Sequence, residues 1–569
     1  MPQDDNTEAA TSDTANVLAT GVSNLDQLLA GGLPRNAFVL IMGRPGSGKT
    51  TLANQIAFHA ARSGKRVLIL TALSESTSKL IAHLRSFDFF DQSLIGGPIQ
   101  FLSLQPLLDQ GLEAAGREIL SMARRMSADM VVLDGFRGMR GIEGAPLLAR
   151  QFLYDVGTTL STMGSMFLVT TETEPTDPTF YPETTTADVI IALHYNVVDV
   201  AQRRTLEVIK ARGRAPLPGL HSLALSSKGA IIYPQFEVRV IQELLDQRHR
   251  LDEHIPVNTV APSERASSVG TSTVDVSETS DGQDYAPFGL PELDHLMNGG
   301  LTRATSTLVA GSSGTGKTLL ALNFAVAGVR AGEPTLYVGL REGLDQILAK
   351  ADAFNLGRDL RQALLPGGGL TLLRIPPIQL NPDVVADRLL GELDRIGAKR
   401  LIVDSIYELE RAIRTSEHPR RLDDYLAALL EALHARRVTA LFTRETEKAL
   451  AASLDFSGEP LSVLAENVIL LQQVVFRQEL YRLLSVLKMR MSPHDNTLRE
   501  FRIVSPSGIT VLESVQSASG VLEGIAEQEG GGNTAPGMDG QSGSASIRAA
   551  NNDGRAGAER RGVKRGEGR

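Results

Sequence analysis

The chain of 569 residues contains no cysteine, and only 5% of its residues are aromatic. The absence of cysteine excludes disulfide bonds and thiolate metal sites, and it fits a cytoplasmic protein. No uninterrupted apolar stretch approaches the length of about 20 residues that a membrane-spanning helix needs. Residues 1–6 are acidic and polar and lack the basic and apolar regions of a signal peptide. We therefore expect a cytoplasmic protein without a membrane segment.

The sequence also lacks an excess of basic residues. Lys and Arg number 57 against 66 Asp and Glu, which gives a net charge of −9 and a pI of about 5.7. A surface that binds nucleic acid usually leaves a basic footprint. The acidic composition therefore disfavours nucleic acid as the main partner, and no loop that combines basic and aromatic residues is evident.

Two glycine-rich segments match the pattern G-x-x-x-x-G-K-[ST]. Residues 43–50 read GRPGSGKT, and residues 311–318 read GSSGTGKT. In such a loop the backbone N–H groups surround phosphate oxygens, the lysine reaches the β- and γ-phosphates, and the hydroxyl holds Mg²⁺. A strand-like apolar run precedes each loop and a helical pattern follows it, which is the context that the motif requires. The sequence therefore predicts two sites for ATP and Mg²⁺.

The residues expected to bind nucleotide come from the two loops and the first turn of each following helix. They are Gly43, Gly46, Ser47, Gly48, Lys49, Thr50 and Thr51 in the first copy, and Gly311, Gly314, Thr315, Gly316, Lys317, Thr318 and Leu319 in the second. One match to this pattern can arise by chance, but two matches in the same context make that explanation remote.

The two loops lie inside an internal repeat. The segment LDQLLAGGL at 25–33 resembles LDHLMNGGL at 293–301, and the copies are 268 residues apart. That spacing is too long for a solenoid and suits two tandem domains. The Ser-rich segment between the copies and the Gly- and Ser-rich end are typical of a flexible linker and a disordered tail. The expected boundaries are 16–244 and 285–515 for the domains, 251–284 for the linker and 517–569 for the tail.

Within each domain, short continuous apolar runs alternate with helical patterns. Such runs occupy residues 67–70, 130–133 and 166–169 in the first domain, and 401–403 and 440–442 in the second. Strands without polar alternation suit a mostly parallel sheet that is covered on both faces. The sequence therefore predicts the α/β class, with helices flanking a mostly parallel sheet.

An acidic residue ends one of these apolar runs in each domain. Asp134 and Asp404 lie 91 and 93 residues after the first glycine of their loops. A carboxylate at the end of a buried strand can hold Mg²⁺ together with the hydroxyl of Thr50 or Thr318. Capping of the next helix is the alternative, and the repeated spacing favours the metal site.

A second carboxylate follows the strand after each loop helix. Glu75 and Glu342 lie 32 and 31 residues past the first glycine of their loops. A glutamate there can orient and deprotonate the water that attacks the γ-phosphate. The alternative is a glutamate at a helix N-terminus, where the helix dipole favours it.

A basic pair occurs late in each domain, as Lys210 with Arg212 and as Lys488 with Arg490. Alternate residues of a strand point to the same face. Two cations on one face can stabilise a transferring phosphoryl group, including one on the nucleotide of a neighbouring subunit. An ordinary solvated edge strand is the alternative.

Together, the Gly-Gly-Leu before each loop, the glutamate, the strand-end aspartate and the Lys-x-Arg pair resemble the RecA-like ATPases, and specifically the KaiC family of double-domain circadian-clock ATPases. The most specific segments are VILLQ at 468–472, LKMRMSPHD at 487–495 and REF at 499–501. The resemblance implies two tandem RecA-like P-loop NTPase domains that hydrolyse ATP, and a homohexamer of two stacked rings. It also implies ATP between subunits, reached by the Lys-x-Arg pairs of the adjacent protomer, and serine/threonine autokinase activity in the second domain.

The sequence departs from the family pattern at two places. The family carries paired glutamates after the strand, and Ser74 and Arg341 replace the first of each pair. Ser462 matches the phosphorylated serine of the family, but Val463 replaces the adjacent threonine and has no hydroxyl to phosphorylate. The resemblance therefore leaves Ser462 as the main phosphosite candidate, with Ser457 as a weaker one, and it implies slow chemistry or another base at both sites.

The leading hypothesis is a hexameric, KaiC-like signalling ATPase that uses ATP and Mg²⁺ and binds regulatory proteins that the sequence does not identify. One alternative is a DNA-acting RecA-like recombinase or helicase relative. Another is a ring that binds ATP mainly as a structural ligand. ATP turnover with and without single-stranded DNA separates the three.

Overall fold

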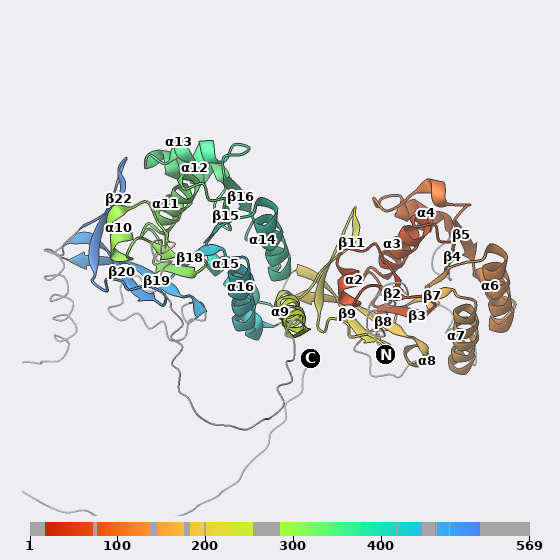
Figure 1. Ribbon diagram of the computed structural model, residues 1–569. Helices are drawn as coiled ribbons and strands as arrows, with labels where there is room; N and C mark the ends of the chain where they lie inside the picture. The colour runs from red at the N-terminus through yellow and green to blue at the C-terminus, as the bar shows by residue number, and fades with distance from the viewer. Residues whose placement is uncertain are drawn as a thin grey trace, which may run out of the picture. The chain divides into compact units, whose positions relative to one another are not determined.

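The computed structural model describes most of both repeats (Figure 1). The described residues are 17–71, 77–136, 145–175, 182–198, 201–253, 285–378, 380–416, 418–446, 461, 464–476 and 478–512. The expected tail at 517–569 and most of the expected linker lie outside them. Within these ranges, each repeat forms a nine-stranded sheet with helices on both faces. This confirms the predicted α/β class with two tandem RecA-like P-loop domains.

In the first repeat, the strand order is β11-β10-β9-β8-β3-β7-β6-β4-β5. The six strands from β8 to β5 are parallel, and β9, β10 and β11 extend the sheet in antiparallel fashion. The strands are β3 (Phe38–Gly43), β4 (Val67–Thr71), β5 (Ile99–Ser103), β6 (Met130–Asp134), β7 (Met166–Thr171), β8 (Val189–Val198), β9 (Ala201–Ala211), β10 (His221–Ser226) and β11 (Gly229–Tyr233). The α-helices are α2 (Leu25–Leu28), α3 (Lys49–Arg62), α4 (Thr77–Leu84), α5 (Gln105–Leu108), α6 (Leu112–Met126), α7 (Ala145–Thr162), α8 (Pro182–Thr186) and α9 (Phe236–Glu253).

The second repeat has the equivalent order, β16-β15-β17-β18-β14-β19-β20-β21-β22. The strands are β14 (Ser306–Gly311), β15 (Thr335–Gly339), β16 (Leu370–Arg374), β17 (Arg400–Asp404), β18 (Thr439–Glu445), β19 (Asn467–Phe476), β20 (Glu479–Met489), β21 (Arg499–Val504) and β22 (Gly508–Val511). The α-helices are α10 (Pro291–Leu296), α11 (Lys317–Arg330), α12 (Leu344–Ala353), α13 (Gly357–Ala363), α14 (Pro382–Ile396), α15 (Ile406–Arg414) and α16 (Leu422–Ala435). A separate two-stranded sheet precedes each large one, β1 (Val17–Leu18) with β2 (Leu33–Pro34), and β12 (Tyr285–Ala286) with β13 (Leu301–Thr302).

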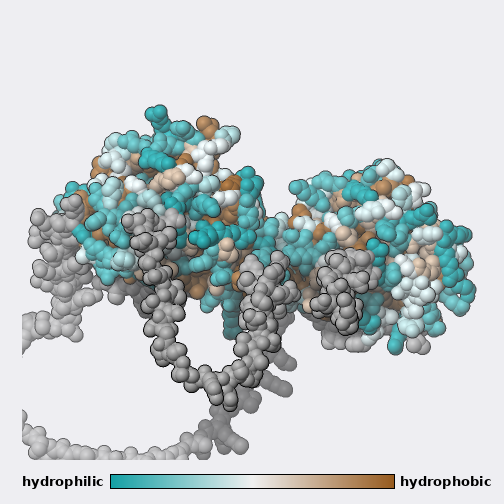
Figure 2. Space-filling view, in the orientation of Figure 1, coloured by the Kyte–Doolittle hydropathy of each residue, from teal (hydrophilic) through white to brown (hydrophobic). Residues whose placement is uncertain are grey.

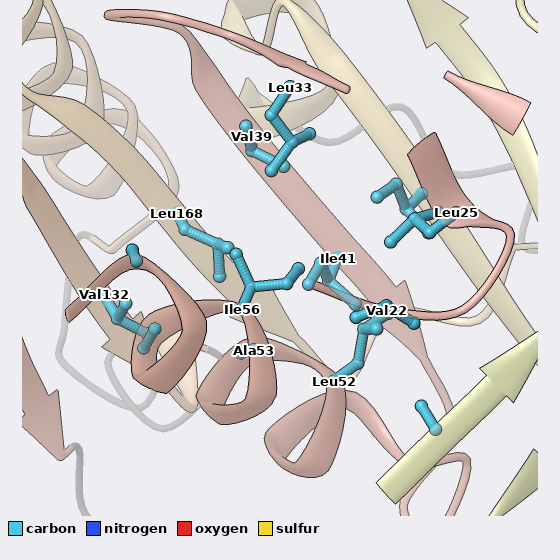
Figure 3. Close-up of a cluster of buried hydrophobic side chains, with 14 of the residues drawn as sticks. Val22, Leu25, Leu33, Val39, Ile41, Leu52, Ala53, Ile56, Val132 and Leu168 are labelled. Carbon is cyan, nitrogen blue, oxygen red and sulfur yellow. The ribbon is translucent and has the colours of Figure 1, made fainter. Parts of the chain in front are cut away.

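The central strand β3 is buried on both faces. Val39 and Ile41 belong to one apolar cluster, which also contains Ile56 of helix α3, and Figure 3 shows these side chains packed between strand and helix. Leu40 and Met42 point the other way, into a cluster with residues of α6 and α7. Because side chains alternate along a strand, a continuous apolar run fits a sheet that is covered twice.

Helix α9 runs past the expected end of the first domain. It extends to Glu253, so the first three residues of the expected linker 251–284 are helical. Phe236 and Val240 are buried in the same apolar cluster as residues of α14 and α16 of the second repeat. These contacts join the start of the helix to elements that lie far away in the sequence.

The surface of the described residues in the view of Figure 2 is mainly hydrophilic, with scattered apolar side chains. Among the described residues, no helix combines the length and apolar character required to cross a membrane.

Candidate nucleotide sites

The first phosphate loop connects strand β3 to helix α3. The helix begins at Lys49, directly after Gly48, whose φ of 106° favours glycine. A Cβ at Gly48 would lie only 2.9 Å from Cδ1 of Leu225, so the loop also packs too closely for a side chain. The Lys49 ammonium donates to the carbonyl oxygen of Arg44 at 3.0 Å. The buried hydroxyl of Ser47 has no hydrogen-bond partner among the described residues.

The second phosphate loop has the same construction between β14 and α11. Gly316, with a φ of 100°, precedes the first helical residue, Lys317. The Lys317 ammonium donates to the carbonyl oxygens of Gly311 at 2.8 Å and Ser312 at 2.7 Å. Within the described part of the chain, the buried hydroxyl of Ser312 also lacks a partner.

Both loops fit a bound polyphosphate. Burial lowers the pKa of Lys49 and of Lys317, and nearby carboxylates oppose this effect. Each lysine is turned onto carbonyl oxygens of its own loop, and each loop contains a buried serine hydroxyl without a partner. Phosphate oxygens would accept hydrogen bonds from both groups and from the helix N-terminus. The other predicted nucleotide-binding residues lie in the loops or the first helical turns: Gly43, Gly46, Thr51, Gly314, Thr315 and Leu319.

The predicted metal-binding pair is in direct contact in the first repeat. Asp134 ends β6, and its Oδ1 accepts hydrogen bonds from the hydroxyls of Thr50, at 3.2 Å, and Thr170. Burial raises the pKa of the Asp134 carboxyl, and these hydrogen bonds oppose the rise. A hydroxyl and a carboxylate at the end of a phosphate loop are suitable ligands for Mg²⁺, which is usually bound through one or two carboxylates plus substrate phosphates.

The corresponding pair of the second repeat shares a pocket without a direct bond. Asp404 ends β17 and accepts hydrogen bonds from Tyr337, at 2.8 Å, and from Thr443. Thr318 and Asp404 both line a cavity of about 380 Å³. The lining residues are Ser313, Gly314, Gly316, Lys317, Thr318, Leu319, Arg341, Glu342, Lys350, Phe354, Asp404, Ser405, Glu445, Arg482 and Ile503. These side chains include a lysine, a hydroxyl and a carboxylate that suit a magnesium nucleotide.

The two glutamates predicted as bases have different outcomes. Glu75 lies outside the described residues, as does Ser74. Glu342 lines the second cavity, and its Oε1 is paired with the ammonium of Lys350. Its Oε2 is buried, and no hydrogen-bond partner occurs in the described residues. Glu342, the predicted base, therefore lines the second cavity, but its Oε1 already forms an ion pair with Lys350.

Arg341, which the resemblance places where a glutamate is expected, is held between two carboxylates. Its Nε lies 2.8 Å from Oε1 of Glu408, and its Nη1 lies 2.5 Å from Oε2 of Glu445. The hydrogen bond that Arg341 donates to the Glu445 carboxylate raises the pKa of the guanidinium above its usual value. Arg341 and Glu445, paired with each other, therefore both line the second cavity.

The Lys-x-Arg pair of the first repeat lies near the end of the sheet at which β3 begins, whereas the phosphate loop follows the other end of that strand. Lys210 donates to the carbonyl oxygen of Ala187 at 2.6 Å, and Arg212 lies 3.1 Å from Oδ1 of Asp188. Asp188 in turn accepts from the backbone N–H of Phe38, the first residue of β3, at 3.0 Å. The loop starts five residues later along the strand, a span of about 17 Å. Neither cation lies near its own loop.

The second repeat places its pair in the same way. Lys488 donates to the carbonyl oxygen of Ala465 at 2.7 Å, and the backbone N–H of Arg490 donates to the carbonyl oxygen of Glu466 at 3.2 Å. The Glu466 carboxylate accepts from the backbone N–H of Ser306, which begins β14. In both repeats a β-bulge lies just before the lysine, since the register shifts at the residues opposite. The repeated bulge gives both pairs the same placement.

An arginine beside each phosphate loop was missed by sequence reasoning. Arg204 donates from Nε to the carbonyl oxygen of Gly46 at 3.2 Å and lies over the ring of Tyr195 at 4.7 Å. Arg482 lines the cavity of the second loop. Each lies six residues before the Lys-x-Arg lysine. That repeated offset is the signal that could have identified them.

A repeated carboxylate was also missed. The segments TTETE at 170–174 and TRETE at 443–447 share the pattern T-x-E-T-E. Their first glutamates, Glu172 and Glu445, are the carboxylates that most strongly oppose the lowering of the pKa of Lys49 and Lys317. Glu445 also lines the cavity that contains Lys317.

The expected phosphosite Ser462 lies outside the described residues, together with Val463 and Ser457. The structure describes Leu461 and Leu464 beside it, and both contribute to the cluster of apolar side chains under α14 and α16.

Two tandem units of this kind, each with a phosphate loop on a nine-stranded RecA-like sheet, define a P-loop ATPase of the double-domain class. The family profile described as "ATPase: KaiC" matches residues 18–237 and 286–516. The chain therefore belongs to the KaiC ATPase family.

Named relatives cover most of the chain. It is 24% identical over 519 residues to the circadian clock oscillator protein KaiC of Picosynechococcus sp., an alignment covering 89% of this chain and 92% of that protein. It is 25% identical over 519 residues to the circadian clock protein KaiC3 of Synechocystis sp., covering 89% of this chain and 94% of that one. The resemblance inferred from the motifs is thus confirmed, at low sequence identity.

Proposed function

We propose that the chain is a hexameric signalling ATPase that binds Mg-ATP in both repeats, at the boundaries between subunits. The placement of the Lys-x-Arg pairs carries this proposal. Lys210 and Arg212 lie about 17 Å along the strand from their own phosphate loop, and Lys488 and Arg490 lie likewise. These cations can stabilise a phosphoryl group only if the nucleotide belongs to a neighbouring subunit. The proposed number of six subunits comes from the family resemblance.

Each site has the groups needed to hold the nucleotide and its metal ion. Lys49 and Lys317 bind β- and γ-phosphate oxygens, while Thr50 with Asp134, and Thr318 with Asp404, hold Mg²⁺. The bound ion neutralises phosphate charge. Glu75 and Glu342 are the proposed bases that orient the attacking water.

The second repeat is also proposed to phosphorylate Ser462. The serine hydroxyl needs a base near the phosphate, and Glu342 is the proposed one, because an arginine cannot take a proton. The proposed location is the cytoplasm, with domains at 16–244 and 285–515. The main partner is further copies of the chain, beside regulatory proteins that remain to be identified.

The test is the mass of the assembly with and without Mg-ATP, measured by native mass spectrometry at micromolar protein. We expect a hexamer with Mg-ATP and its loss in the double variant Lys210→Ala, Arg212→Ala. Lys228→Ala, which changes an exposed lysine of the same repeat, is the matched control and should assemble normally. A chain that stays monomeric at saturating Mg-ATP would refute the proposal.

A second function is favoured by the charges around the second cavity. Arg341 forms an ion pair with Glu445, and Lys350 forms one with Glu342. Both carboxylates that could activate a water molecule are therefore already paired with a cation. The second ring then binds ATP mainly as a structural ligand, and the first supplies most of the turnover. ADP release by Lys49→Ala and Lys317→Ala, each with and without single-stranded DNA, separates this from a motor in which both rings hydrolyse ATP or DNA stimulates turnover.

A further inference from the structure

Arg341 lies where the nucleotide's terminal phosphate would be bound. It follows strand β15, whose last residue pairs in register with Asp404. It lines the same cavity as Lys317 and Thr318; burial lowers the pKa of Lys317, and the charge of Arg341 acts in the same direction. The lysine and the strand-end aspartate of a phosphate loop lie at the β- and γ-phosphates, away from the base and ribose. Arg341 is therefore on the terminal side of the site.

The two carboxylates that hold Arg341 differ in how deeply they are buried. The Glu408 side chain is 4% exposed, whereas that of Glu445 is 28% exposed and that of Arg341 is 54% exposed. Separating Glu408 from Arg341 would leave this buried carboxylate with the more distant and exposed guanidinium of Arg411, whose Nη2 lies 3.3 Å from Oε2, which is unfavourable. Separating Glu445 returns a partly exposed carboxylate to water, which costs much less. The pair with Glu408 is thus an anchor, and the pair with Glu445 is exchangeable.

A guanidinium has five N–H donors, and the two ion pairs engage Nε and Nη1. Arginine binds phosphate through two parallel hydrogen bonds, and these charge-assisted bonds are about twice as strong as neutral ones. A phosphate oxygen can therefore replace Glu445 while Glu408 keeps the side chain in place.

We propose that Arg341 is the specificity-determining residue by which the second site distinguishes ATP from ADP, exchanging Glu445 for the terminal phosphate. This inference rests on the proposed nucleotide site at Lys317. ADP leaves Arg341 on Glu445, because it lacks the phosphate that would replace the carboxylate. The first repeat has Ser74 at the equivalent position in the sequence, so the discrimination belongs to the second site.

The experiment measures nucleotide affinity rather than turnover. The parent is full-length Lys49→Ala, in which nucleotide binds at the second site, and the probes are Mg-ADP and a non-hydrolysable ATP analogue titrated by calorimetry. Arg341→Gln should weaken binding of the ATP analogue by about 10- to 100-fold, the range of hydrogen bonds to charged groups. Binding of ADP should change less than about twofold, which also shows that the site is folded.

Two further variants complete the test. Glu445→Gln removes the competing carboxylate and should tighten binding of the ATP analogue only. Arg361→Gln is the matched control, since that arginine is 52% exposed and pairs with Asp352 on the surface; it should change neither affinity. Equal weakening of both nucleotides by Arg341→Gln, or no change in either, would overturn the inference while leaving the nucleotide site intact. A parent that binds no nucleotide would overturn the proposed second site itself, and the inference with it.

Discussion

Replacing Asp134 with asparagine separates the cost of burying this carboxylate from its use in binding Mg²⁺. The side chain accepts hydrogen bonds from Thr50 and Thr170, and an asparagine carbonyl can accept both. Burial raises the pKa of the Asp134 carboxyl, so its ionised form destabilises the nucleotide-free fold near neutral pH. In a Lys317→Ala parent, Asp134→Asn should therefore raise the melting temperature without nucleotide.

The same change should remove the stabilisation that Mg-ATP provides. A ligand at 100 times its Kd stabilises a folded protein by about 2.7 kcal/mol. For a domain of this size, 1 kcal/mol shifts the melting temperature by about 2–4 °C. Mg-ATP should therefore raise the melting temperature of the parent by about 5–10 °C, and that of the asparagine variant by much less.

The pH dependence of the stability tests independently whether the ionised Asp134 destabilises the nucleotide-free fold. Because folding raises the pKa of Asp134 above its unfolded value, the native state binds the proton more tightly. The parent should gain stability as pH falls through the raised native pKa, and Asp134→Asn lacks that gain. The advantage of asparagine should therefore shrink as pH falls.

Calorimetry of nucleotide-free and Mg-ATP-saturated protein over a pH series measures all three effects. Asp109→Asn changes an exposed aspartate of the same repeat and serves as the control. A lower melting temperature for the nucleotide-free asparagine variant, or a full Mg-ATP shift in it, would refute the assigned role of Asp134.

Two other predictions concern nucleotide content and chemistry. Lys49→Ala and Lys317→Ala should each bind about half of the nucleotide of the unchanged protein, because each removes one phosphate-binding lysine; equilibrium dialysis showing full stoichiometry in either would contradict the two-site assignment. Phosphorylation of Ser462 should be slow, because loss of a general base lowers a rate by about 10²–10⁴-fold. Arg341→Glu combined with Glu408→Gln and Glu445→Gln, which avoids new like-charge pairs with both former partners of the arginine, should accelerate it, as followed by mass-spectrometric mapping after incubation with Mg-ATP. Rapid phosphorylation in the unchanged protein would show that Arg341 does not limit the rate.

The parts of the fold that depend on local patterns could be predicted from the sequence. The apolar runs before the phosphate loops became β3 and β14, because continuous apolar segments of this length fit only a sheet that is covered on both faces. The strand-end aspartates Asp134 and Asp404 were found from their position after an apolar run and from the similar intervals of 91 and 93 residues after their loops.

The parts that depend on distant contacts could not be predicted. Arg341 meets Glu408 and Glu445, which lie 67 and 104 residues later in the chain, and no local pattern brings them together. Helix α9 reaches Glu253, beyond the expected domain end at 244, and its residues Phe236 and Val240 pack on the second repeat, a contact between segments far apart in the sequence. The placement of Lys210 and Arg212 away from their own loop follows from strand register, which the sequence does not state.

The central claim, that the Lys-x-Arg pair acts on the nucleotide of a neighbouring subunit, is tested most directly by mixing two inactive variants. Both carry Lys317→Ala, so that the measured ADP release comes from the first repeat only. One also carries Lys49→Ala, and the other carries Lys210→Ala with Arg212→Ala. In a mixed ring, an intact loop of one subunit meets an intact basic pair of its neighbour, so ADP release should exceed that of either variant alone. If mixing never raises ADP release although mixed rings form by native mass spectrometry, the pair does not act across the boundary.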